Sequence, residues 1–382
     1  MVRIATAAEA MPGSLKLCYG ESDLPTPAFI SAAADAALKA GHTFYTHTAG
    51  CGALREAVAA KIHELHDVTY RPSEIMSTVG ASMAIYAAIR AFVSRGDNAV
   101  IVSPAYAIFT NGVTMAGGEP RPVPLARDGT GFRLDLDRVR AAIDGSTRMM
   151  VVNSPSNPTG WVISVEDQRA LLELAAQHDL VILADEVYER LVYLPSEALA
   201  KEGDVAVAAS FARLAGPRDR LIVVNSFSKT YNMTGWRLGW AQASEATIAT
   251  MYRAVEFMTS NAAAMVQQAG IVALRDGEPC IRDLRAHYAA RRAEVMAALS
   301  ALPGVTLPEP AGSFFAFPRI EGLTDSTAFT MALLRDTGLA LAPGVAFGAT
   351  GEGYVRICFA ASEATVTAAL RKLRHFLTTA VD

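Results

Sequence analysis

The chain has 382 residues, with 34 Lys and Arg against 38 Asp and Glu, so its formal net charge is −4. Charged residues make up 19% of it and apolar residues 51%, whereas an average soluble domain is roughly 25% charged. A membrane, a large core or a subunit interface has to accommodate this apolar surplus. At roughly 150 residues per domain, the length predicts two or three domains, or one large α/β domain with an appendage.

Local sequence excludes several classes of protein. A membrane-spanning helix needs about 20 mostly apolar residues, and polar residues interrupt both long uncharged stretches, 98–118 and 257–274. Glu9 and Pro12 interrupt any signal peptide at the N-terminus. No basic block is present, which argues against binding to nucleic acid. We therefore expect a cytoplasmic protein that acts on small molecules away from any membrane.

The cysteines and histidines form no familiar metal or disulfide pattern. The four cysteines are scattered and contain no CxxC motif, which is typical of reduced thiols in the cytosol. His63 and His66 lie three residues apart on a predicted helix, but no third ligand follows at a familiar spacing. We therefore expect no metal site.

In chain order, short runs rich in Val and Ile alternate with amphipathic stretches. The runs lack polar alternation, which is typical of parallel strands buried on both faces. Helical spacing of apolar residues predicts helices over 54–66 and 81–92, and Ser164 with Asp167 marks the start of another. The runs predict strands at 74–79, 99–103, 149–153, 180–184 and 221–225.

The C-terminal part has a different pattern. A long charged helix is expected over 282–302, and strands at 313–318, 339–342 and 354–359 precede a closing helix at 370–377. The whole pattern predicts an α/β fold, in which helices cover both faces of a mostly parallel sheet in a large domain and a smaller α+β domain follows. We expect an N-terminal segment at 1–35 that joins the small domain, a large domain at 36–284 and the small domain at 285–382.

Polar side chains follow the predicted strands at their carboxyl ends, where open α/β sheets bind ligands. Asp185 closes a buried apolar run, and a carboxylate there needs a cationic partner; taken alone, it is equally well a helix N-cap. Asn157 lies in a turn after the strand at 149–153, and the pattern by itself shows only a turn. Tyr106 follows the end of the strand at 99–103, where packing is the simpler interpretation.

The loop after the strand at 221–225 carries Ser226, Ser228, Lys229 and Arg237. Hydroxyls and a fixed guanidinium suit a phosphate, and a lysine in apolar surroundings loses its proton and attacks carbonyls. A helix that begins at Gly80-Ala81-Ser82 offers free N–H groups to an anion. A lysine for a Schiff base, an acid, an aromatic ring and a phosphate cradle together describe a pyridoxal phosphate site.

These segments resemble the signature blocks of the fold-type-I pyridoxal-phosphate-dependent aminotransferases of class I/II, the aspartate aminotransferase superfamily. The pattern Ser-x-Ser-Lys followed by Gly-x-Arg-x-Gly at 226–239 is highly specific. Asn-Pro-Thr-Gly at 157–160 and Asp-Glu-x-Tyr at 185–188 match in order and spacing. Further similarity lies at 17–27, 45–55, 310–317, 342–348 and 354–359, so the resemblance covers nearly the whole chain.

The resemblance implies a role for each matching residue. Lys229 would form the Schiff base with the cofactor, and Asp185 would keep the pyridine nitrogen protonated. Asn157 and Tyr188 would bind the ring hydroxyl, and Tyr106 would stack on the ring. A tyrosine matching Tyr45 reaches the phosphate of the neighbouring subunit in this family, which implies a homodimer. The phosphate would be bound by Gly80, Ala81, Ser82, Ser226, Ser228 and Arg237.

Arg356 has an argument of its own from strand alternation. Val355, Ile357 and Phe359 share one face of the predicted strand, so Arg356 points from the other face. If the apolar face packs on the core, Arg356 points toward the cleft between the domains; the alternative is a solvent-facing arginine. The resemblance implies that Arg356 and Asn157 bind the α-carboxylate of the substrate, with a backbone contact from Gly20.

The predicted activity is transfer of an amino group from an L-amino acid to a 2-oxo acid by a ping-pong mechanism, with 2-oxoglutarate or pyruvate as acceptor. One alternative is β-elimination at a C–S bond, as in cystathionine, on the same scaffold. A remote alternative is a non-catalytic regulator, although the chain begins almost at the first family block and leaves no room for a DNA-binding domain. Thr114 stands where one aspartate-using subgroup has a lysine, which puts strict aspartate specificity in doubt.

Overall fold

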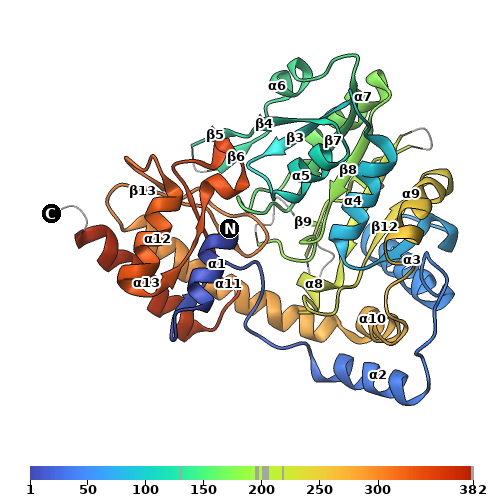
Figure 1. Cartoon of the computed structure of the whole chain (residues 1–382), viewed down its shortest axis with the longest axis horizontal. Helices are drawn as coiled ribbons and strands as arrows, with labels where there is room; N and C mark the ends of the chain where they lie inside the picture. The colour runs from blue at the N-terminus through green and yellow to red at the C-terminus, as the bar shows by residue number, and fades with distance from the viewer. Residues whose placement is uncertain (130, 194–197, 200–205, 217–218, 380–382) are drawn as a thin grey trace.

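The Val- and Ile-rich runs form the central sheet of the computed structural model, which describes residues 1–129, 131–193, 198–199, 206–216 and 219–379. The sheet has seven strands in the order β2-β12-β11-β8-β7-β3-β4 (Figure 1). Only β12 runs antiparallel to its neighbours within this sheet. The strands are β2 (Ile75–Thr78), β3 (Asn98–Ser103), β4 (Glu119–Pro124), β7 (Thr147–Asn153), β8 (Val181–Asp185), β11 (Leu221–Ser226) and β12 (Gly239–Ala243).

Helices cover both faces of this sheet, because successive residues of each buried strand point to opposite sides. Ile101 of β3 packs with the residues of α4, α5 and α9 on one face, whereas Val100 packs with α6 and α7 on the other. A third cluster joins the β2–β12 edge to α2, α3 and α10. The helices are α2 (Ala28–Lys39), α3 (Gly52–His66), α4 (Ala81–Phe92), α5 (Ile108–Met115), α6 (Leu136–Ala141), α7 (Val165–His178), α9 (Glu245–Met258) and α10 (Ala264–Asp276).

The C-terminal elements form a separate layer beside the sheet (Figure 1). Helix α11 (Glu278–Ser300) leads into it, and β14, β18 and β17 form an antiparallel sheet. Its elements are β13 (Val305–Thr306), β14 (Phe315–Ala316), β15 (Arg319–Ile320), α12 (Ser326–Thr337), β16 (Leu339–Ala340), β17 (Ala342–Pro343), β18 (Val355–Cys358) and α13 (Glu363–Thr379).

The N-terminus of the chain joins this C-terminal layer. Strand β1 (Leu15–Lys16) pairs in parallel with β16, and α1 (Val2–Glu9) buries Ile4 and Ala8 in a cluster with Phe317 and Leu334. The sequence assigns residues 1–35 to the small domain; α1 and β1 join the C-terminal layer, whereas Ile30 of α2 packs in the cluster at the β2–β12 edge. The domain division stays a prediction. The short elements are β5 (Ala126–Asp128), β6 (Gly131–Arg133), β9 (Ala198–Leu199), β10 (Val207–Ala208), α8 (Phe227–Thr230), and single 3₁₀ turns η1 (Pro72–Glu74), η3 (Phe211–Arg213), η4 (Gly344–Phe347) and η5 (Ala349–Gly351).

Two strands of the central sheet, β4 and β12, were not predicted, and the boundaries of the predicted elements differ most in the C-terminal layer. Helix α11 begins at Glu278, before the expected start at 282, because Pro279 favours the first helical turn. The strand expected over 313–318 shrinks to Phe315–Ala316, since Ser313 has a positive φ of 60°, which is incompatible with an extended strand. Within the described residues, no helix has the length and apolar character needed to cross a membrane.

A cluster of charges around the buried Arg190 holds the start of α11 against α3 and the segment after β8. The guanidinium of Arg190, just beyond β8, donates two hydrogen bonds to Glu278, at 2.9 and 2.6 Å. Lys61 of α3 also contacts Glu278, at 3.3 Å, and Glu64, at 2.8 Å. Arg190 is only 3% exposed, so its charge depends on this carboxylate rather than on water.

Replacing Glu278 should therefore destabilise the fold. Glu278→Gln removes the countercharge of a buried arginine, and we expect the free energy of unfolding to fall by about 2 kcal/mol. The matched control is Asp137→Asn, which breaks an exposed ion pair with Arg140 of 2.8 Å and should cost less than about 1 kcal/mol. Urea unfolding followed by circular dichroism measures both. Equal losses in the two variants would contradict the argument.

Candidate active site

A cavity of about 350 Å³ opens at the carboxyl ends of the central strands. The sheet, the N-terminal segment and β18 all contribute to its wall. It brings together residues that are more than 300 positions apart in the sequence. The predicted residues that line it are Gly20, Ala81, Ser82, Tyr106, Asn157, Asp185, Tyr188, Ser226, Ser228, Lys229, Arg237 and Arg356.

Lys229 lies on the one-turn helix α8, directly after β11. Its Nζ donates a hydrogen bond of 2.6 Å to the carbonyl oxygen of Gly20. It also lies 5.9 Å from the ring centroids of Tyr188 and Phe314. Desolvation in the cavity lowers the pKa of Lys229 to about 8, because burial penalises the ammonium form. More of this amine is therefore neutral and nucleophilic near pH 7 than of an ordinary lysine.

Asp185 ends β8 and is buried. Its Oδ1 accepts a hydrogen bond of 3.2 Å from the N–H of Val187. Desolvation raises the pKa of Asp185 to about 7, against the opposing effects of that hydrogen bond and the charge of Lys229. The sequence predicts a cationic partner, but none of the described side chains forms an ion pair with it. A buried acid of this kind fits a ligand that brings its own protonated nitrogen into the cavity.

Backbone and side-chain donors meet at the start of α4. Ala81 and Ser82 form its first turn, where the backbone N–H groups have no partner within the helix. Gly80 has a φ of +74°, and a Cβ there would lie 2.3 Å from Nη2 of Arg237. Gly80 does not line the cavity itself. Its lack of a side chain leaves room for the guanidinium of Arg237. This arrangement fits a phosphate group.

The loop around α8 supports the same end of the cavity. The Ser226 hydroxyl caps α8 by accepting a hydrogen bond of 2.9 Å from the N–H of Ser228. Arg237 adopts a positive φ of 54° and donates through Nη1 to the carbonyl of Thr234, at 2.7 Å. The strained backbone of Arg237 is typical of a functional position. The hydrogen bond to Thr234 uses only Nη1, so the other guanidinium nitrogens can bind an anion.

Arg356 of β18 is buried, so the interpretation of a solvent-facing arginine is wrong. Nη1 donates to Oδ1 of Asn157 at 2.8 Å, and Nη2 donates to the carbonyl of Cys18 at 2.5 Å. The guanidinium carbon lies 4.3 Å from the ring centroid of Phe315 and 4.9 Å from that of Phe347. Burial lowers the pKa of Arg356. Among the described side chains no carboxylate pairs with it, so it can accept the carboxylate of a ligand.

Two tyrosines face the cavity in different environments. Tyr188 is buried edge-to-face against Phe314 and Phe315, with ring centroids 5.3 and 5.7 Å apart. Desolvation raises the pKa of Tyr188 well above its usual value, so its hydroxyl stays protonated and can donate a hydrogen bond. Tyr106 follows β3 and is partly exposed at the cavity wall, where its ring is available for stacking.

Tyr45 does not reach the cavity of its own chain. It is 90% exposed, and so are Phe44 at 81% and Phe257 at 88%. Among the residues that the sequence predicts for the site, only Tyr45 and Gly80 do not line the cavity. Large apolar side chains at such exposure are a typical sign of an interaction surface.

The cavity also contains residues that the sequence analysis did not assign to it. Asn153 ends β7, accepts a hydrogen bond of 2.8 Å from the N–H of Asn157 and donates one of 3.1 Å to the carbonyl of Asp185. It therefore positions both neighbours, and its polar side chain at a strand end was a usable signal. Met1 and Tyr19 also line the cavity, but no local pattern distinguishes them.

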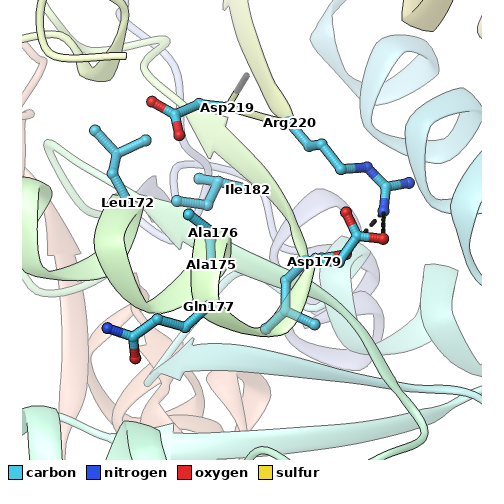
Figure 2. Close-up of a pocket in the computed structure, with 9 residues that line it drawn as sticks. Leu172, Ala175, Ala176, Gln177, Asp179, Ile182, Asp219 and Arg220 are labelled. Atoms are coloured by element: carbon cyan, nitrogen blue, oxygen red, sulfur yellow. Dashed lines mark hydrogen bonds and ion pairs between the residues drawn. The ribbon is translucent and has the colours of Figure 1, made fainter. Parts of the chain in front are cut away.

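A second hollow, of about 420 Å³, lies at the opposite, amino ends of β8 and β11 (Figure 2). It contains the ion pair between Arg220 and Asp179, at 3.0 Å. Its described lining has no lysine, histidine or cysteine to act as a nucleophile or base. The smaller cavity at the carboxyl ends, with its buried amine and acid, is therefore the candidate active site.

Comparison with known proteins agrees with this choice. The family model for aminotransferase class I and II matches residues 13–373. An aspartate aminotransferase from Pyrococcus abyssi and aromatic-amino-acid aminotransferase 2 from Thermococcus litoralis are each 35% identical to it, over 97% of this chain and 93% of theirs. The solved structure of an aromatic aminotransferase from Pyrococcus horikoshii superposes with a TM-score of 0.90, at 33% identity and 99% coverage of both chains.

The pattern of apolar runs predicted the α/β fold, and the resemblance predicted the family and the roles of the site residues; the family and the fold are confirmed. The chain belongs to the class I and II aminotransferases, pyridoxal-phosphate-dependent enzymes that transfer an amino group between amino acids and 2-oxo acids.

Proposed function

We infer that this chain takes the amino group from an L-amino acid and gives it to a 2-oxo acid, 2-oxoglutarate or pyruvate, in two half-reactions at one site. The observation that carries this proposal is the convergence of three groups in one cavity. They are the amine of Lys229, the carboxyl of Asp185 and the guanidinium of Arg356, and no ion pair within the described chain satisfies any of them. An amino-acid substrate and a cationic ring would supply the missing charges.

The residues of the cavity fit pyridoxal phosphate. The α4 N-terminus with Ala81 and Ser82, together with Ser226, Ser228 and Arg237, would hold the phosphate. Asp185 would pair with the ring nitrogen, Asn157 and Tyr188 would bind the ring hydroxyl, and Tyr106 would stack on the ring. When bound, the cofactor supplies an aldehyde that captures the amino group and a ring that withdraws electrons from the substrate.

Lys229 would do the acid–base work at the substrate. Its amine takes the proton from the α-carbon and returns it on the other side of the transferred nitrogen, as general base and then general acid. Desolvation lowers the pKa of this amine to about 8, which brings it close to neutral pH, where such a catalyst is most effective. The hydrogen bond to the Gly20 carbonyl holds Nζ inside the cavity.

Arg356 would orient the substrate. Its planar guanidinium, packed against the rings of Phe315 and Phe347, has little freedom to move and can bind a carboxylate through two parallel hydrogen bonds. Asn157 contacts the same guanidinium and would share in this binding. Gly20 would add a backbone contact. The α-carboxylate is thereby fixed on one side of Lys229, which selects the bond that reacts.

The active enzyme would be a homodimer that shares its sites across the interface. The exposed apolar side chains of Phe44, Tyr45, Phe257 and Met258 support this proposal, because a second copy of the chain would cover them. Tyr45 would then reach the phosphate in the neighbouring subunit. We also propose the three-part domain division predicted above and a cytoplasmic location, which the free state of all four cysteines supports.

Removing the amine should abolish catalysis. We expect Lys229→Ala to lower turnover by about 10³-fold or more, because no other group at that position moves the proton, and to lose the visible absorption band of the lysine-bound cofactor. The matched control, Lys39→Ala, removes an exposed amine on α2 and should keep both. Full turnover of Lys229→Ala, in a protein with unchanged thermal unfolding, would refute the assignment.

The same assay separates amino transfer from elimination. The wild-type enzyme should convert an amino donor and a 2-oxo acid into a new amino acid and a new oxo acid. It should release no pyruvate and ammonia from cystathionine alone, which is the product pair that β-elimination would give.

The pKa of Lys229 predicts its pH-dependent reactivity in the cofactor-free enzyme. Only the neutral amine reacts with acetic anhydride, and desolvation lowers the pKa to about 8. The labelling rate of Lys229, mapped by peptide mass spectrometry, should therefore rise through pH 8 and level off above it. Lys39 in the same digest corrects for hydrolysis of the reagent. A rate that still rises past about pH 10, as for lysine in a model peptide, would contradict the shift.

Subunit mixing tests whether the sites are shared. Tyr45→Ala and Lys229→Ala should each be impaired alone. In a hybrid dimer, one site would combine both changes, whereas the other would have Lys229 from one subunit and Tyr45 from its neighbour, both unchanged. Mixing the two variants should therefore restore activity, up to about a quarter of the wild-type value with random pairing. If mixing restores nothing, Tyr45 does not act across the interface.

A further inference from the structure

The side chains of the turn after β8 divide between the active-site cavity and the interior behind it. Asp185, Val187 and Tyr188 line the cavity, whereas Glu186 and Glu189 do not. Both glutamates are nonetheless buried, and a buried carboxylate is unfavourable without a hydrogen-bond donor. The N–H of Glu189 donates a hydrogen bond of 2.9 Å to the carbonyl of Glu186. The turn is therefore tight, and a movement of Glu189 would also move Tyr188, its neighbour in the chain.

His66 contacts Glu189 from the side away from the cavity. It is the last residue of α3 and, of the seven histidines, all of which lie in the described residues, it is the only buried one. Its Nε2 lies 2.8 Å from Oε2 of Glu189. The other ring nitrogen, Nδ1, has no hydrogen-bond partner among the described residues. Replacing the imidazole would therefore remove the contact with Glu189 and no other polar contact of that ring.

The surroundings of the pair make Glu189 dependent on His66. Burial by itself would lower the pKa of His66, but the hydrogen bond and the charge of Glu189 raise it. Glu186 repels Glu189, and Arg190 directs its two side-chain hydrogen bonds to a different carboxylate. Without His66, the Glu189 carboxylate would have no hydrogen-bond donor among the described side chains. Further titratable groups that act on the pair are Arg213 and Tyr231.

We propose that His66 is a positioning residue for the cofactor: through Glu189 it holds Tyr188 where the phenol can donate to the ring hydroxyl of pyridoxal phosphate. The imidazole itself does not line the cavity, so it touches no reacting group. The inference rests on the proposed function, which gives Tyr188 its contact with the ring. Neither His66 nor Glu189 lies in the segments that resemble the family, so the resemblance assigns them no role.

The contact made by Tyr188 has a spectroscopic consequence. A hydrogen bond donated to the ring oxygen favours the anionic form of that oxygen. It therefore lowers the pH at which the lysine-bound cofactor loses the proton between its ring oxygen and the lysine nitrogen. The loss of this proton changes the visible absorption of the cofactor. A Tyr188 that is displaced should raise the midpoint of this titration.

An absorption titration of the holoenzyme tests the role of His66. His66→Leu removes the donor to Glu189, and we expect the midpoint to rise by about one pH unit, the shift that corresponds to one hydrogen bond to a charged group. His66→Gln keeps an N–H donor at the end of the side chain and should largely restore the wild-type midpoint. The matched control, Ile62→Val, removes one methyl group from a buried position one turn earlier in α3 and should leave the midpoint unchanged.

A double-mutant cycle shows whether the effect passes through Tyr188. Tyr188→Phe should raise the midpoint by itself, and His66→Leu should add nothing in that background. Fully additive shifts would mean that His66 affects the cofactor by another route, which would overturn the positioning role. An equal rise in Ile62→Val would overturn it as well, because a general loosening of α3 would then account for the effect.

A measurement on the wild-type protein keeps the inference testable even if His66→Leu does not fold. Coupling between two sites is reciprocal, so binding of pyridoxal phosphate to the cofactor-free protein must change the titration of His66. NMR of protein with ¹⁵N-labelled histidine should show this change, with the His66 signal assigned by its absence from His66→Gln. The signal of His375, exposed on α13, should not change. An unaltered titration of His66 would overturn the inference.

The outcomes separate this inference from the function on which it rests. If Tyr188→Phe leaves the midpoint unchanged, Tyr188 does not contact the ring hydroxyl, and that part of the proposed function is wrong. If Tyr188→Phe raises the midpoint and His66→Leu, correctly folded, does not, the assignment of Tyr188 stands and only the role of His66 is overturned.

Discussion

The cavity keeps an amine, a carboxyl and a guanidinium out of water without giving any of them an ion-pair partner, and much of the fold serves this arrangement. Transfer of a charged group into a low-dielectric interior is unfavourable, and the consequence is visible in the shifted pKa values of Asp185, Lys229 and Arg356. The rest of the fold has to offset that unfavourable term. A ligand that brings a cation for the acid and an anion for the guanidinium removes this electrostatic cost. Ligand binding is therefore more favourable than it would be if these groups were already paired within the protein.

Three separate parts of the chain meet at these groups, which explains why the site needs both layers. Asp185 and Lys229 follow neighbouring parallel strands, β8 and β11, so their separation is set by the sheet. Arg356 comes from β18 in the C-terminal layer. The backbone at 18–20 contacts both Arg356 and Lys229. A shift of the C-terminal layer relative to the sheet would therefore change the distance between the substrate carboxylate and the amine.

The sequence predicted those parts of the site that follow from local order. Buried strands are recognisable as Val- and Ile-rich runs, and polar residues at their carboxyl ends, such as Asp185, are conspicuous. Tyr19 could not be found this way, because its hydroxyl donates a hydrogen bond to Glu9, at the end of a helix, α1, that the sequence analysis did not predict. Ser313 shortened a predicted strand through a backbone conformation that serine rarely adopts. Neither feature leaves a periodic pattern of apolar residues in the sequence.

The apolar surplus of the sequence has a similar explanation. Parallel strands buried on both faces need apolar residues at every position, and Ile101 and Val100 serve opposite cores. A sheet that is buried on both faces, with a third apolar cluster at its edge, contains far more apolar side chains than a sheet with one face in water. These buried clusters do not account for the apolar side chains on the surface, of which Phe44, Tyr45 and Phe257 are the most exposed. Since Tyr45 also belongs to a motif that resembles the family's, these exposed side chains are the ones that the proposed second subunit would cover.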